Sequence, residues 1–206
     1  SYHQFDHNSV KVHRLLFMRK VYSRMKLPLK TRIALRFHNA KRHRSRLSKK
    51  LTITQNDPGI SSLLIAIPEP VDQRRVALAF INALKDSIGK TGHITLRIVG
   101  DEVNRNNIGI DLVDDFRGYS NTDINRFGIL KSSALNRILS RKFDAAVDLN
   151  PDFHPVTAQL VCASNAHLRI GFQSEEKESF FNVFIERDKE GFIEMGYLRI
   201  QKLLGL

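Results

Sequence analysis

Two carboxylates and an imidazole follow a short apolar segment in the second half of the chain. Asp148, Asp152 and His154 come directly after the run Phe143 to Val147. These residue types perform general acid–base chemistry and bind metal ions. The alternative is structural, with Asp148 accepting hydrogen bonds from nearby backbone amides while two prolines shape the turn. We favour the structural interpretation, and we predict no metal site and no bound cofactor.

The elements that position these residues form a strand–helix–strand unit. Phe143 to Leu149 predicts a buried strand, residues 156–164 a helix, and Arg169 to Phe172 the end of a second strand. An apolar run that continues into Asp-Leu-Asn-Pro is typical of a central parallel strand that opens into a loop. Open α/β sheets bind their ligands at such strand ends.

The same alternation extends over most of the chain. It predicts an α/β fold, a single Rossmann-like domain with a parallel sheet covered by helices on both faces. The expected strands are 63–67, 93–99, 108–113 and 180–186, and the expected helices are 70–88, 131–140 and 191–204. Residues 114–121 are expected to be a polar loop. The inward residues expected in the first and last of these helices are Val76, Ala79, Phe80, Ala83, Leu84, Ile193, Met195, Leu198 and Leu203.

The net charge of +12 is concentrated at the N-terminus. Residues 1–50 hold 15 Lys and Arg against a single acid, Asp6, which gives +14. The remaining residues hold 18 bases and 20 acids, which gives −2. We therefore divide the chain into a basic helical arm (1–50), a turn-rich linker (51–62) and the α/β domain (63–206).

Helical spacing in the arm predicts helices over 9–26 and 29–47, separated at Pro28. Ile33, Ala34 and Phe37 form a thin apolar stripe in the second. Either the arm packs on the domain with solvated basic faces, or it binds a polyanion: an acidic protein, anionic lipid or nucleic acid. The residues predicted to bind an anionic partner are Lys11, Arg14, Arg19, Lys20, Arg24, Lys26, Arg32, Arg36, Lys41, Arg42, Arg44, Arg46, Lys49 and Lys50.

Other sequence features restrict the class of protein. No run approaches the eighteen or so apolar residues of a transmembrane helix, and the N-terminus lacks a secretory apolar region. The single cysteine, Cys162, excludes an internal disulfide, favours a reducing compartment and is expected to be a buried thiol. We therefore expect a cytoplasmic protein, peripheral to a membrane. The sequence contains no nucleophile elbow, no P-loop and no dinucleotide-binding glycine motif after the first strand.

Two blocks of the sequence resemble a known enzyme family. FDAAVDLN, followed by a helix and a strand ending in RIGF, is similar to the N-terminal half of bacterial glycosyltransferase family 9, the heptosyltransferases. Leu63 to Lys85 resembles the opening strand, loop and helix of the same family. The resemblance covers about residues 60–172 and implies a Rossmann-like half of a GT-B architecture.

The chain departs from that family at the residues on which its activity depends. The family's first loop is rich in glycine and ends in Gly-Asp, whose aspartate is the catalytic base. Here Asp72 matches that aspartate only across a gap, Val71 replaces the glycine, and two prolines stiffen the loop. A second, donor-binding domain of the family has no counterpart in this sequence. The resemblance therefore implies the fold and a degenerate, non-catalytic member, with Asp72 as a weak catalytic candidate.

Three hypotheses for function follow. The first is a non-catalytic accessory or linker subunit that docks through its basic arm on an acidic protein or complex at a membrane surface. An assembly of the bacterial photosynthetic antenna–reaction-centre type would be one such setting. The second is a sugar-binding or sugar-transfer protein of the glycosyltransferase family 9 type. The third is an RNA- or ribosome-associated protein.

Overall fold

The computed structural model describes residues 27–43, 59–91, 94–109, 112, 115–173, 180–186 and 192–206. Within these residues, six parallel strands form one sheet in the order β3-β2-β1-β4-β5-β6. The strands are β1 (Ser62–Ala66), β2 (Thr95–Asp101), β3 (Phe116–Tyr119), β4 (Ala145–Asp148), β5 (Leu168–Phe172) and β6 (Val183–Ile185). This is the strand order of a Rossmann-like domain, so the predicted fold class is confirmed.

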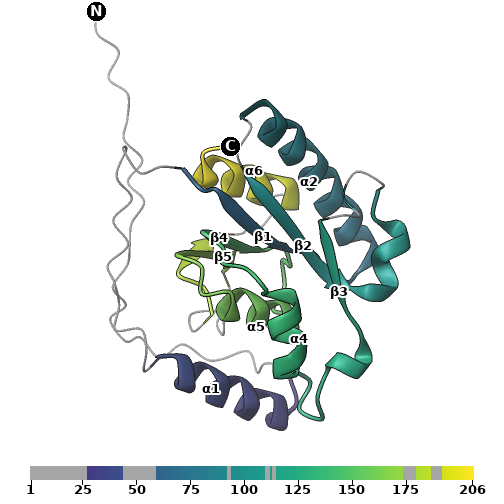
Figure 1. Ribbon diagram of the computed structural model, residues 1–206, viewed down its shortest axis with the longest axis vertical. Coiled ribbons are helices and arrows are strands. Elements are labelled where there is room, and N and C mark those ends of the chain that lie inside the picture. Colours follow the sequence, from purple (N-terminus) through teal and green to yellow (C-terminus); the bar gives the residue numbers. More distant parts are fainter. Residues whose placement is uncertain are drawn as a thin grey trace, which may run out of the picture.

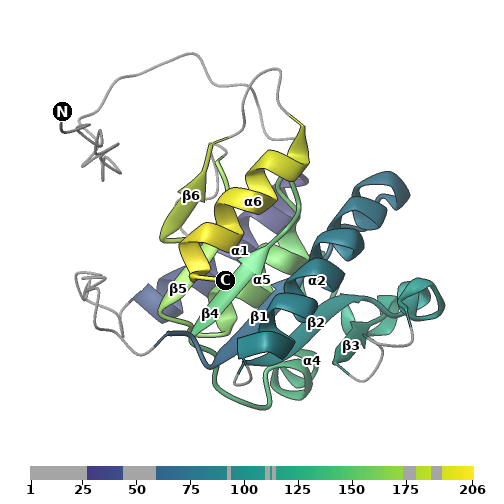
Figure 2. The same ribbon diagram turned by 90° about the horizontal axis from the view of Figure 1, so that it is seen from above.

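Helices cover both faces of the sheet (Figures 1 and 2). One face is covered by α2 (Val71–Thr91) and α6 (Ile193–Leu204), and the other by α4 (Ser132–Ile138) and α5 (Pro155–Ala163). Cys162 on α5 is buried, as predicted. A further helix, α1 (Leu29–His43), packs on the outer side of α5. None of the described helices combines the length and the apolar character that crossing a bilayer requires.

The central strand β1 shows why the sheet has two apolar faces. Its side chains alternate, so Leu63 and Ile65 pack towards α2 and α6 while Leu64 and Ala66 pack towards α5. All four side chains are fully buried. The near-continuous apolar run that the sequence contains is what a parallel strand buried on both faces requires.

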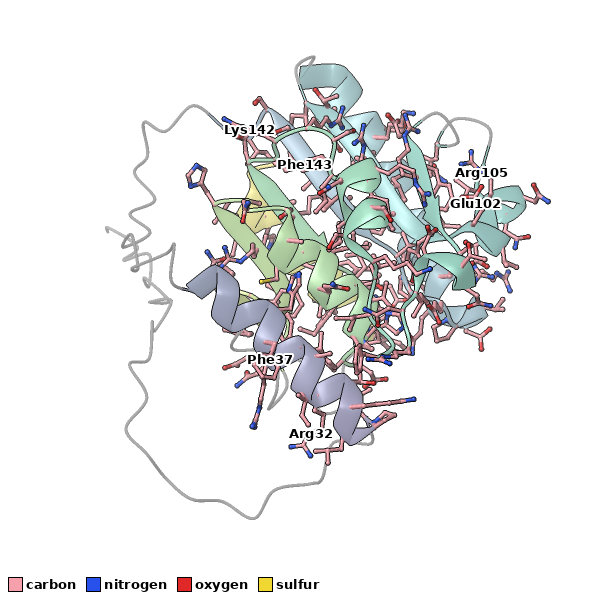
Figure 3. The ribbon with its side chains drawn as sticks, turned by 60° about the horizontal axis from the view of Figure 1, so that its bottom comes forward. Arg32, Phe37, Glu102, Arg105, Lys142 and Phe143 are labelled. Atoms are coloured by element: carbon pink, nitrogen blue, oxygen red, sulfur yellow. The ribbon has the colours of Figure 1, made fainter. Side chains whose placement is uncertain are left out.

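One predicted strand was wrong. The third strand is Phe116–Tyr119, which the sequence assigned to a polar loop, whereas 108–113 is not a strand in its described residues. Phe116 and Tyr119 are buried and flank the exposed Arg117 and the half-buried Gly118. With only two apolar residues, this short edge strand lacks the apolar pattern by which strands are predicted from sequence. The connection from β2 to β3 contains the 3-10 helix η1 (Glu102–Asn107), where Arg105 pairs with Glu102 (Figure 3). The Arg105 guanidinium also lies over the Phe116 ring.

The predicted inward faces of two helices were wrong in part. In α2 the buried apolar residues are Ala77, Ile81, Leu84 and Ile88, while Ala79 and Ala83 are exposed. In α6 the buried residues are Gly196, Tyr197, Ile200 and Leu204. Met195 and Leu198, which were expected to be inward, are 49% and 47% exposed. Both helices carry more apolar residues than one face can hold. The helical periodicity alone therefore does not decide which side of each helix faces the sheet.

A close approach in the core fixes the orientation of α6. Gly196 faces the Phe172 ring of β5, and a Cβ atom at this position would overlap a ring carbon. Tyr197 packs against the rings of Phe80 and Phe172, and its hydroxyl donates a hydrogen bond to the Leu149 carbonyl at 3.0 Å. These contacts turn Tyr197 inward and therefore leave Leu198 on the outer side.

The start of the sheet is held by a single carboxylate. Asp144 Oδ2 accepts hydrogen bonds from the backbone nitrogens and the hydroxyls of Ser61 and Ser62, at 2.7 to 3.0 Å. Burial opposes ionisation of this carboxyl, but the four donors hold its pKa below the usual value. Asp144 therefore fixes the register between β1 and β4 at the amino ends of these strands. A ligand site is expected at their opposite, carboxyl ends.

Candidate functional site

The carboxyl ends of β1, β3 and β4 bring together a group of polar side chains. We call Glu69, Tyr119, Asp148, Asn150, His154 and Thr157 the strand-end cluster. It lies where β1 and β4 are neighbours, and the chain leaves β1 towards one edge of the sheet and β4 towards the other. Ligands of open α/β sheets bind at such a switch point, so this is the place where the fold would hold a ligand.

Glu69 is the centre of the cluster. Its Oε1 accepts a hydrogen bond from the Tyr119 hydroxyl at 3.0 Å and lies 3.2 Å from His154 Nε2. Arg74 donates a hydrogen bond to the Glu69 carbonyl at 2.6 Å, which fixes the backbone of the loop. Among the described residues, none donates to the second carboxylate oxygen, and the side chain is 43% exposed. One oxygen of Glu69 can therefore receive a ligand.

The electrostatics make Glu69 an acceptor. The hydrogen bond with His154 lowers the pKa of Glu69 against the opposing effect of partial burial, and Tyr119 adds to the lowering. Burial raises the pKa of Tyr119 far above its ordinary value, and the nearby Glu69 carboxylate adds to this. At neutral pH Glu69 is ionised and Tyr119 is a neutral donor. A carboxylate with a lowered pKa is a weak general base, so the arrangement favours binding over proton abstraction.

His154 serves as an N-cap. Its Nδ1 accepts a hydrogen bond from the Thr157 backbone nitrogen at 3.5 Å, at the start of α5. This assigns the imidazole proton to Nε2, which faces Glu69. Both ring nitrogens of His154 are therefore engaged, and the imidazole positions the Glu69 carboxylate.

Asp148 is a structural residue. It is fully buried, and its Oδ1 accepts hydrogen bonds from the Asn150 backbone nitrogen at 3.0 Å and the Asn150 side chain at 2.6 Å. Its Oδ2 accepts one from the Thr157 hydroxyl at 3.0 Å. The hydrogen bond that the structural interpretation expected from a nearby backbone amide to Asp148 is therefore confirmed. Asp152 lies exposed on the turn that precedes α5.

Asp72, the candidate that the family resemblance supplied, lies apart from Glu69's partners. It is exposed in the first turn of α2 and lines the rim of a groove between α2 and α6. Nowhere in the described part of the chain do three or more His, Cys, Asp or Glu side chains gather in a way that could hold a metal ion. Of the two acidic residues in the strand-end cluster, Asp148 is buried and Glu69 is exposed, and sequence reasoning missed Glu69.

The predicted anion-binding residues are described only in part. Arg32 and Arg36 lie on α1, together with Lys30. Lys41 and Arg42 belong to α1, but their side chains are outside the described set. The others lie outside the described residues: Lys11, Arg14, Arg19, Lys20, Arg24, Lys26, Arg44, Arg46, Lys49 and Lys50.

The helix α1 has two opposite faces. Thr31 and Leu35 are buried at 4% and 3% exposure, and Leu35 belongs to the core formed with α5. On the outer side, Leu29, Ile33 and Phe37 are 69%, 45% and 73% exposed. These three recur every fourth residue and so form one line along the helix. We call Leu29, Ile33 and Phe37 the α1 stripe.

Cations flank the α1 stripe. Lys30 and Arg36 are exposed and Arg32 is half-buried, and the sequence of α1 contains no acid. Figure 3 shows Arg32 and Phe37 on this helix at the border of the molecule. The predicted apolar stripe of Ile33, Ala34 and Phe37 is divided between the two sides of α1: Ala34 packs against the core, whereas Ile33 and Phe37 are exposed.

The fold and the position of the strand-end cluster define a Rossmann-like α/β protein. Residues 39–196 match a family of unknown function, DUF6913, and the chain belongs to that family. A comparison with curated proteins found no significant match.

Two solved structures of E. coli heptosyltransferase WaaC are similar in structure to this chain. The structure with ADP-2-deoxy-2-fluoro heptose has a TM-score of 0.48 at 13% identity, over 70% of this chain and 48% of the enzyme. The structure with ADP has a TM-score of 0.46 at 15% identity, over 70% of this chain and 47% of the enzyme. The chain spans about half the length of these enzymes. The loss of catalytic activity and of a donor-binding domain remains a prediction.

Proposed function

We propose that this protein is a non-catalytic docking or linker subunit that attaches through α1 to an anionic surface at a membrane. The observation that carries this proposal is the α1 stripe: three exposed apolar side chains between cations, on a helix without acids. A helix with this pattern lies in the interface of an anionic bilayer, with its apolar side chains among the acyl chains and its cations at the headgroups. Acidic protein surfaces at the membrane present the same charge.

The attachment of α1 to the domain supports a linking role. Leu35 anchors the helix on α5, so the inner face is occupied and the outer face is left for a partner. An amphipathic helix that only completed the core would have a single apolar face. Here the second apolar face is exposed, and a bound surface would be coupled rigidly to the sheet.

The test is co-sedimentation of the full chain with vesicles of phosphatidylcholine that contain phosphatidylserine, compared with phosphatidylcholine alone. We expect binding to the anionic vesicles only. Each cation near an anionic surface contributes about 1 kcal/mol, so Arg36→Glu, which changes the charge by two, should weaken binding roughly thirtyfold. Point substitutions are preferable to deletion of 1–50, because deletion would uncover the core surface beneath Leu35.

Lys142→Glu is the matched control. It makes the same change of charge at an exposed lysine far from α1, as Figure 3 shows, and should leave binding within about twofold. Equal binding to neutral vesicles, or equal loss in the two variants, would contradict the proposal. If only an acidic protein is captured from the native source and Arg36→Glu abolishes that capture, the docking role stands with protein as the anionic surface. Tighter, salt-steep binding to RNA than to vesicles would replace it with the nucleic-acid hypothesis.

The strand-end cluster supports a second candidate function, binding of a hydroxyl-rich ligand such as a sugar. The supporting observation is the ionised Glu69 carboxylate, which is held through Oε1 by Tyr119 and His154 on a side chain that is 43% exposed. Such a carboxylate accepts hydrogen bonds from hydroxyl groups. Calorimetric titration with a nucleotide sugar and with free heptose checks this. Binding that Glu69→Gln removes and Asp72→Asn keeps would support it, and no heat at millimolar ligand would sink it.

A further inference from the structure

The outer face of α6 carries a second exposed apolar surface, unrelated to α1. Met195 and Leu198 are 49% and 47% exposed, on the side of the helix opposite to the buried Tyr197 and Ile200. Beside them, α2 and α6 enclose a groove of about 650 Å3. Ala79 and Ala83 of α2 lie on its lining together with Leu198. Figure 1 shows the two helices together on one side of the sheet, while α1 lies beyond the other side.

The charges along this face are arranged symmetrically about Leu198. Glu194 is four residues before it and Lys202 four residues after it, and Met195 and Gln201 are three residues before and after. Residues three and four apart lie on one side of a helix, so these five side chains form a single row. Glu194 and Lys202 are both exposed, in the first and last turns of α6. We call Glu194, Met195, Leu198, Gln201 and Lys202 the α6 row.

A row of this kind is complementary to itself when reversed. In a two-fold dimer the same surface meets its copy, and residue i contacts j while j contacts i. If the axis passes through Leu198, the two α6 helices are antiparallel, and Glu194 of each copy meets Lys202 of the other. Leu198 packs on Leu198, Met195 lies opposite Gln201, and the groove beside Ala79 and Ala83 gives the partner's side chains room.

We infer that the protein forms a two-fold dimer through the α6 row and the adjoining α2 groove. The mixed charge distinguishes this face from the α1 stripe. Glu194 and Asp72 on the rim of the groove would repel a polyanion, and Arg75, which also lines the groove, leaves this face mixed in sign, unlike the acid-free α1. A second copy places opposite charges at both ends and apolar side chains in the centre, the distribution that protein interfaces have.

Sedimentation velocity of the full chain over about 1 to about 100 µM tests the inference, because self-association depends on protomer concentration. We expect a reversible monomer–dimer equilibrium. Leu198→Asp should raise the dimer dissociation constant by about a hundredfold or more, because the two-fold axis places the substituted residue of both protomers in the interface. Val103→Asp is the control, since Val103 is a comparably apolar residue, 81% exposed, on η1. A protein that is monomeric at every concentration, or a dimer that Leu198→Asp leaves unchanged, would overturn the inference.

Charge reversal separates a dimer contact from a role within the helix. Glu194 and Lys202 also interact favourably with the dipole of their own helix. Reversing both charges would therefore lower the stability of α6 at both of its ends. In the antiparallel dimer the double variant restores both pairs. We therefore expect Glu194→Lys and Lys202→Glu each to weaken the dimer several-fold, and the double variant to recover it to within about twofold. A double variant that dimerises more weakly than either single variant, with thermal stability lowered further, would overturn the pairing.

Discussion

The outer surfaces of α1 and α6 differ in one respect that decides what each can bind. Both expose apolar side chains in line along a helix, Leu29, Ile33 and Phe37 on α1 and Met195 and Leu198 on α6. The α1 stripe is flanked by cations alone, while the α6 row has an acid at one end and a base at the other. We propose that the apolar residues supply the affinity in both cases, and that the flanking charges select an anionic surface for α1 and a second copy for α6.

The inner and outer faces of α1 should respond very differently to truncation. Leu35 is 3% exposed, whereas Phe37 is 73% exposed. We expect Leu35→Ala to lower the free energy of unfolding by roughly 3 kcal/mol, because it leaves a cavity against α5. Phe37→Ala should change the free energy of unfolding by ~0.5 kcal/mol or less, because it removes few contacts. Urea unfolding followed by circular dichroism measures both. Equal losses would mean that Phe37 is packed and the α1 stripe is not a free surface.

The same contrast should hold within α6, with a smaller effect. The Tyr197 hydroxyl donates to the Leu149 carbonyl, whereas the Leu198 side chain is largely exposed. Tyr197→Phe leaves that buried acceptor unpaired and should lower the free energy of unfolding by roughly 1 kcal/mol. Leu198→Ser, measured on the monomer, should lower it by ~0.5 kcal/mol or less. Thermal melts at a concentration below the dimer dissociation constant check the pair. A larger loss for Leu198→Ser would place that residue in the core of a single chain.

Salt should also separate the two surfaces, without any substitution in the protein. Between about 50 and about 300 mM sodium chloride, binding of α1 to anionic vesicles should weaken more than about tenfold, because many exposed cations are screened together. Dimerisation should change less than about threefold, because its two rim pairs are exposed and its centre is apolar. The measurements are vesicle titration and sedimentation velocity. Similar salt slopes would remove the distinction between the surfaces.

Sequence reasoning predicted the sheet because the buried parallel strands carry a strong signal. The run Leu63 to Ile67 and the segment before Asp148 are apolar throughout, and both became central strands. The edge strand Phe116–Tyr119 was missed because only two of its four residues are apolar and buried. The directions of α1, α2 and α6 depended on contacts such as that between Gly196 and Phe172, which no periodicity contains.

The strand-end cluster was only half predictable. His154 was noticed because it follows a strand, whereas Glu69 was passed over between two prolines in a loop that the family resemblance assigned to Asp72. The two residues meet because β1 and β4 pair in parallel, so that the loops after both strands open at one edge of the sheet. The available signal was that Glu69 also follows a predicted strand. The hydrogen bond from Tyr119 could not be foreseen, since β3 itself was misplaced.

The central claim, that the charges beside each apolar row select its partner, is tested most directly by flotation on vesicles of phosphatidylcholine and phosphatidylserine. Two full-length variants are compared, Ile33→Ser/Phe37→Ser and Met195→Ser/Leu198→Ser, below the dimer dissociation constant so that avidity does not contribute. We predict that the α1 variant loses about tenfold or more in vesicle binding, while the α6 variant stays within about threefold of the unchanged protein. Equal binding by both variants, or a greater loss in the α6 variant, would contradict the account.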